Sequence, residues 1–116
     1  MSKRKARVID GIEVEKGSGN VYADLGYLDA DEMLIKAKLV SKISEIVRGK
    51  GLTQVETAKI LGLPQPKVSA LLRGQFRGIS ERKLINCLTM LGRDVEIVVK
   101  DSPRRRTGGK VTVVFA

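Results

Sequence analysis

The arrangement of small, turn and apolar residues between positions 54 and 73 constrains the fold more than any other feature of this chain. Ala58 is small enough to lie where two helices cross at a steep angle. Gly62, four residues later, can adopt a positive φ at little steric cost, which ends one helix and redirects the chain. Val68 and Leu71 lie three residues apart and so share one face of a second helix. The segment predicts two short helices joined by a tight turn, the second with a polar outer face.

This spacing resembles the helix-turn-helix motif of the Cro and phage-repressor (XRE) family. The motif's glutamine, alanine, glycine and two apolar positions correspond here to Gln54, Ala58, Gly62, Val68 and Leu71. The resemblance extends from about residue 29 to residue 91. It implies a mainly α fold, a compact helix-turn-helix bundle of the lambda-repressor type that binds double-stranded DNA. A plain helical hairpin, which also uses glycine at its turn, is the alternative interpretation.

The outer face of the second helix is the predicted DNA-reading surface. In the resembling repressors the motif's glutamine touches a DNA phosphate, so the resemblance gives that role to Gln54, which is otherwise an ordinary exposed helix residue. The predicted base-contacting residues of the second helix are Gln65, Lys67, Ser69 and Arg73, with Ala70 placed to meet a thymine methyl group. The alternative for Lys67 and Arg73 is that they are merely solvated helix residues.

Two prolines depart from the family pattern at the start of the second helix. Repressors usually place a capping Ser or Thr where Pro64 stands, and a polar reader where Pro66 stands. Proline is tolerated in a first helical turn because the N–H groups there have no helical partners. The helix is therefore expected to form, with base reading left to the remaining polar side chains.

The segment that follows the second helix is predicted to contact the DNA backbone. The loop at 74–78 carries Arg77, the expected phosphate contact, and Phe76, which is expected to anchor the loop. Ser80 can cap the next helix so that the N–H groups at its start face a phosphate.

Flanking helices are predicted to supply the core. The first runs from about residue 29 to residue 49, and its apolar residues follow the helical period. Its charged residues, expected largely on the opposite side, are Lys36, Lys38, Lys42 and Glu45. Thr53 and Glu56 then form a capping-box pattern at the start of the motif. The last helix follows Ser80, closes the core and ends at Gly92.

Charge and residue usage favour a nucleic-acid partner over an enzyme. The formal net charge of +9 and the pI of about 10.0 favour a polyanion. The motif and its following loop hold four cations against the single acid Glu56, namely Lys59, Lys67, Arg73 and Arg77. With no histidine and only Cys87, the chain lacks the usual imidazole base and a thiolate-rich zinc site. No catalysis, metal or cofactor is expected, and Cys87 is predicted to be a buried core residue.

Membrane association is not predicted. No apolar run approaches the roughly 20 residues that cross a bilayer. The basic start of the chain is not followed by a hydrophobic signal segment. A cytoplasmic protein is expected.

The hydrophobic period changes from helical to alternating after Gly92. Val95, Ile97 and Val99 oppose Glu96 and Lys100, and Val111, Val113 and Phe115 repeat the alternation, which predicts two β-strands. Because a strand pair is marginal alone and repressor operators are commonly palindromic, we expect a two-fold homodimer built partly from these strands. The run Arg104 to Arg106 between them is either a solvated loop or a second phosphate contact.

The sequence divides into a flexible basic N-terminal arm at 1–19, a helix-turn-helix DNA-binding domain at 20–92 and a C-terminal β-strand extension at 93–116. The phrases NVYADLG, LVSKISEIVRGKGLTQ, LLRGQF and GRDVEIVVK resemble compact XRE regulators that include the HigA-type antitoxins. That resemblance implies a repressor of its own operon. In some members it also implies neutralisation of an mRNA-cleaving toxin by protein contact, for which the arm is the candidate surface. A sequence-specific repressor is the favoured hypothesis, and an antitoxin that acts mainly on a toxin protein is the alternative.

Overall fold

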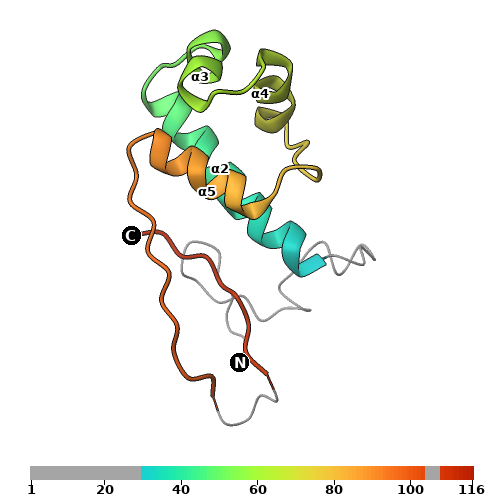
Figure 1. Ribbon diagram of the computed structural model, residues 1–116, viewed down its shortest axis with the longest axis vertical. Coiled ribbons are helices and arrows are strands. Elements are labelled where there is room, and N and C mark those ends of the chain that lie inside the picture. The colour runs from blue at the N-terminus through green and yellow to red at the C-terminus, as the bar shows by residue number, and fades with distance from the viewer. Residues whose placement is uncertain (1–29, 104–107) are drawn as a thin grey trace.

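The computed structural model describes residues 30–103 and 108–116. These residues contain, in chain order, α2 (Ala30–Gly49), α3 (Gln54–Leu61), α4 (Gln65–Leu72) and α5 (Glu81–Met90). α5 packs along α2, and α3 and α4 lie together at one end of this pair (Figure 1). The mainly α bundle predicted from the sequence is confirmed. Its predicted first-helix cap at Asp29 lies outside the described residues, as does the arm at 1–19.

One core joins all four described helices. Each helix contributes a large side chain that is essentially inaccessible to solvent: Ile43, Leu61, Leu71 and Leu84. Cys87 is buried beside them and is a free thiol, as the sequence predicted. Burial raises the pKa of this thiol, with Lys83 opposing the shift, which disfavours the reactive thiolate.

Local sequence signals set the boundaries of α3. The Thr53 hydroxyl accepts a hydrogen bond of 3.0 Å from the Glu56 backbone N–H, and the Thr53 N–H donates to the Glu56 carboxylate at 2.9 Å. This is the predicted capping box. At the other end, Gly62 has φ +65° and its N–H donates to the Ala58 carbonyl. The predicted left-handed turn is therefore present, and it directs the chain from α3 into α4.

The sequence prediction that Lys36 lies on the polar side of its helix, opposite the apolar residues, was wrong. Lys36 is only 4% exposed, because the loop between α4 and α5 crosses that side of α2. Its ammonium group donates to the Arg77 carbonyl at 2.9 Å and pairs with the Glu32 carboxylate at 3.0 Å. Helical periodicity gave no sign of this partner, which lies 41 residues away in the sequence.

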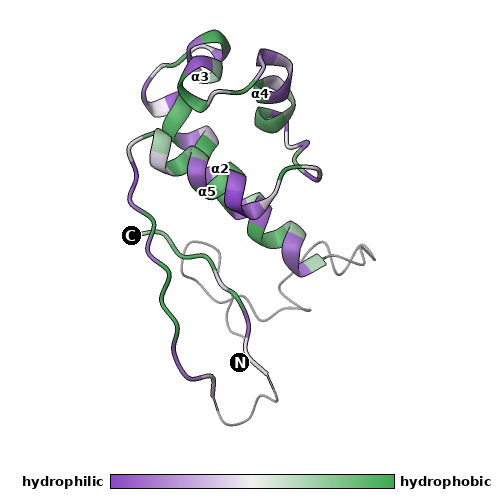
Figure 2. Ribbon diagram, viewed as in Figure 1, coloured by the Kyte–Doolittle hydropathy of each residue, from purple (hydrophilic) through white to green (hydrophobic). Residues whose placement is uncertain are grey.

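The predicted C-terminal strands are not supported. Residues 93–103 and 108–116 contain no strand, and they trace a wide loop that leaves α5 and returns toward the helices (Figure 1). Hydrophobic residues recur along both segments (Figure 2), and Ile97 and Val99 are 80% and 90% exposed. Within one chain the alternating pattern has no sheet to join, and a lone strand pair is marginal. Only the end of the chain docks, with Val113 against the core and Lys42 Nζ 4.9 Å from the centre of the Phe115 ring.

The run Arg104 to Arg106 lies within the gap at 104–107, outside the described residues. Among the helices that are described, none has the length and apolar character needed to cross a membrane.

We predict that Gly62→Ala lowers the free energy of unfolding by about 1 kcal/mol, the cost of a left-handed backbone for a residue with a Cβ. No atom lies within 4 Å of an added Cβ, so backbone strain alone is tested. Urea denaturation measures the change. Gly49→Ala is the matched control, because a Cβ added at Gly49 also meets no atom within 4 Å and Gly49 has no positive φ. The free energy of unfolding of this variant should be unchanged or slightly higher, since alanine favours a helix more than glycine does. Equal destabilisation by both variants would contradict the account.

Candidate nucleic-acid interface

The outward face of α4 is defined by what the helix buries. Val68 and Leu71 are completely buried, which turns Gln65, Lys67 and Arg73 to the exposed side of the helix. Ser69 and Ala70 are half-buried at the edges of that face. The polar surface predicted for the second helix is therefore present, with Ser69 and Ala70 less accessible than the other three.

The two prolines leave α4 intact. Pro64 is the N-cap residue, with φ −61° and ψ 144°, and it makes no side-chain cap. Its carbonyl accepts the backbone N–H groups of Lys67 and Val68 at 3.0 and 3.2 Å, so the first turn closes without a capping hydroxyl. Pro66 occupies the first turn, where no helical donor is lost. The expectation that the helix forms despite both prolines is confirmed.

The starts of α3 and α4 meet around a shallow, open depression. It has a volume of about 210 Å³ and is lined by Gln54, Gln65, Pro66 and Ser69. The residue predicted to touch a phosphate and two of the predicted base readers therefore lie around one space. The N-terminus of α3 opens there too, and helix N-termini attract anions through their unpaired N–H groups and the helix dipole.

Arg73 lies back along the outer face of α4. Its Nη1 donates to the Ser69 hydroxyl and its Nη2 to the Gln75 side-chain oxygen at 3.4 Å. Two predicted readers are thus coupled, and Gln75 joins them although sequence reasoning missed it. An arginine has five N–H donors in a planar fork, so the pairing with Ser69 leaves donors for an incoming base.

A second depression, of about 300 Å³, separates α4 from the start of α5. Its lining residues are Leu63, Lys67, Gly78, Ile79, Ser80 and Lys83. Ser80 caps α5 as predicted, accepting the Lys83 N–H at 3.1 Å. Lys83 was not among the predicted site residues, because only the apolar positions of the last helix entered the prediction. The available signal was a cation three residues after a serine cap, in the turn where the N–H groups are exposed.

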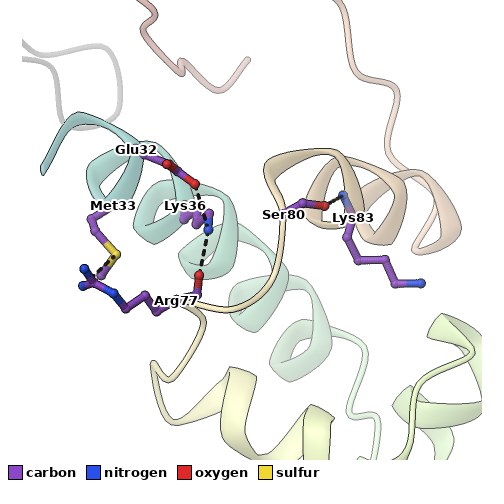
Figure 3. A network of polar contacts seen from close by, with 6 residues as sticks. All are labelled: Glu32, Met33, Lys36, Arg77, Ser80 and Lys83. Atoms are coloured by element: carbon purple, nitrogen blue, oxygen red, sulfur yellow. Dashed lines mark hydrogen bonds and ion pairs between the residues drawn. The ribbon is translucent and has the colours of Figure 1, made fainter. Parts of the chain in front are cut away.

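Arg77 lines neither depression. Arg77 as a whole is exposed, but its guanidinium lies against α2, with Nη1 3.9 Å from the Met33 sulfur (Figure 3). Its backbone carbonyl is held by Lys36 from the same helix. Phe76 beside it is buried and anchors the loop, as the sequence predicted.

Within the described part of the chain, no group of three or more His, Cys, Asp or Glu side chains is placed to hold a metal ion. The candidate surface consists instead of amides, hydroxyls and cations around two helix starts. Such groups bind phosphates and base edges.

Comparison with known proteins agrees with this geometry. A family model described as a helix-turn-helix domain matches residues 21–100. One similar solved structure is described as an XRE family transcriptional regulator. It is 38% identical to this chain, with a TM-score of 0.71, and the match covers 76% of this chain and 99% of that one. No curated protein matches. The chain therefore belongs to the helix-turn-helix family of XRE-type regulators.

Proposed function

We propose that this DNA-binding transcriptional regulator, which is not an enzyme, recognises a specific operator and represses transcription from it. The observation that carries the proposal is the shared depression of Gln54, Gln65 and Ser69 at the meeting of α3 and α4. With α4 in the major groove, Gln65 and Ser69 meet base edges, while Gln54 and the start of α3 hold a phosphate. A repressor acts by occupying its site, so binding is the whole mechanism.

Arg73 is the proposed discriminating residue. It stands at the end of α4 with its guanidinium on the exposed face, and a guanidinium pairs with the O6 and N7 atoms of guanine. Its bond to Ser69 orients the fork before DNA arrives, which reduces the side-chain entropy lost on binding.

The cations around the second depression are proposed to hold the DNA backbone. Lys67 and Lys83 line it together with the Ser80 cap, so two ammonium groups lie beside one helix start. Lysine acts on phosphate as a flexible point charge and carries no base information. We therefore expect Lys67 and Lys83 to contribute to affinity for any duplex and not to sequence preference.

A two-fold homodimer is proposed from the apolar C-terminal segments. No backbone-to-backbone hydrogen bond beyond Arg93 joins the described parts of these segments, and Ile97 and Val99 project into solvent. Pairing with a second copy would satisfy the backbone groups and cover the apolar side chains. It would also give the protein the symmetry of a palindromic operator.

The antitoxin role is a separate proposal, carried by the HigA resemblance. Its candidate contact surface, the arm at 1–19, lies outside the described residues, and no feature of the helical domain favours a toxin as partner. Co-purification with the product of a neighbouring gene tests it.

We predict that Arg73→Ala weakens binding to a selected operator by about 1–3 kcal/mol and relaxes the preference at one base pair. Selection of bound sequences from random duplexes, followed by titrations on the selected and scrambled duplexes, measures both effects. Arg93→Ala is the control, because it removes the same charge from an exposed residue after the C-terminal end of α5 that lines neither depression. Equal losses on both duplexes for Arg73→Ala would refute base reading.

We predict that Lys67→Ala and Lys83→Ala each weaken binding to every duplex alike. Each should lower the magnitude of the slope of log affinity against log salt by about one, the effect of one lost phosphate contact. Titrations at several salt concentrations give the slope. Lys100→Ala removes an exposed lysine that lines neither depression, and it should change the slope less. Unchanged slopes for both test variants would remove these lysines from the interface.

We predict that the double variant Ile97→Asp/Val99→Asp is a monomer with an intact helical domain, since neither side chain belongs to the core. Sedimentation equilibrium gives the mass of the particle, and circular dichroism reports the helices. Thr112→Asp adds one charge at another exposed position as the control. A monomeric wild-type protein, or a double variant that still dimerises, would contradict the proposed interface.

A further inference from the structure

Lys36 is a buried charge that the proposed DNA contacts do not use. Among the described residues, Lys36 is the one charged residue that is buried, with only 4% of its surface exposed. It belongs to α2, while the predicted DNA-contacting residues lie on α3, α4, the loop after α4 and the cap of α5. A lysine in the interior of so small a domain calls for a physical explanation, because desolvation of an ammonium group is costly.

The contacts of Lys36 lead to the loop at 74–78. Its Nζ donates to the Arg77 carbonyl at 2.9 Å, and one helical turn earlier Glu32 accepts from the same ammonium at 3.0 Å. Met33, on the same helix, meets the Arg77 guanidinium at 3.9 Å. α2 therefore holds both the backbone and the side chain of Arg77 (Figure 3).

Stability is a poor explanation for this arrangement. Buried ion pairs seldom contribute net stability compared with apolar side chains of similar volume. The Glu32 side chain is 52% exposed, so water screens much of its attraction for Lys36. What the lysine supplies, and an apolar side chain could not, is a donor aimed at one carbonyl of the loop.

The hydrogen bond from Lys36 adds to the backbone hydrogen bonds that fix the loop. At the start of the loop, the Gln75 N–H donates to the Ala70 carbonyl at 2.9 Å, and at its end the Ile79 N–H donates to the Phe76 carbonyl at 3.0 Å. Arg77 lies within the second of these turns, and its carbonyl points to α2. Lys36 thus fixes the part of the loop that carries the cation.

We propose that Lys36 is a positioning residue for DNA binding, which fixes the backbone at Arg77 so that its guanidinium meets one phosphate beside α4. The inference rests on the proposed DNA-binding function. Lys36 itself touches no DNA, and its effect passes through Arg77. Removal of the lysine should therefore resemble removal of the arginine in its effect on binding, while leaving the fold intact.

The test compares Lys36→Met, Arg77→Ala and the double variant in the full-length protein. Lys36→Met keeps the length of the side chain and removes its donor. Each single variant should weaken binding to selected and scrambled duplexes alike, by roughly tenfold, as for one lost charge-assisted hydrogen bond. The salt slope should fall by about one in each. The double variant should lose no more than either single variant, because both act on one contact.

Two further measurements separate positioning from a structural role. Thermal unfolding of Lys36→Met should match the wild type, and Glu32→Gln, which leaves the bond from Lys36 to the Arg77 carbonyl, should keep wild-type affinity. Markedly lower stability of Lys36→Met, additive losses in the double variant, or unchanged affinity of Lys36→Met would each overturn the inference while the wild type still bound DNA. A wild-type protein that bound no duplex would overturn the proposed function and this inference together.

Discussion

The left-handed turn at Gly62 is the constraint on which the rest of the structure depends. Its N–H and that of Leu63 both donate to the Ala58 carbonyl, which ends α3 and sets the direction of α4. Val68 and Leu71 then become the only buried residues of α4, and its polar residues face outward. A different exit from α3 would rotate these side chains toward the core, where amides and cations lack partners.

The resulting surface has two parts of different chemistry, one around the start of α3 and one around the start of α5. Around the start of α3, Gln54 lies with Gln65 and Ser69, all neutral groups suited to directional hydrogen bonds. Around the start of α5, Lys67 and Lys83 supply charge. Neutral donors and acceptors discriminate base edges, whereas cations attract any duplex and respond to salt. In the proposed interface, the loop after α4 adds Arg77, whose carbonyl is held by Lys36 of α2, so the long helix would support the interface without belonging to it.

The sequence predicted the elements whose signals are local. The capping box at Thr53, the turn at Gly62 and the buried pair on α4 depend on neighbours within a few residues, and each is present. Lys36 was misplaced because its partner comes from a distant loop, which no helical period reveals. The C-terminal alternation was recognised, but the two segments that carry it do not pair in the described part of the chain, and an isolated strand pair is marginal. Gln75, the neighbour of Arg73, likewise required coordinates, whereas Lys83 had a local signal in its place three residues after the Ser80 cap.

The central claim is that the outer face of α4 meets base edges while the starts of α3 and α5 hold phosphates. Nuclear magnetic resonance of the labelled protein, titrated with its selected duplex, tests this claim most directly. The account predicts the largest shift changes at the side-chain amides of Gln54 and Gln65 and at the backbone amides of residues 65–73, with little change along the middle of α2. Shift changes confined to residues 93–116, with α4 unaffected, would contradict it.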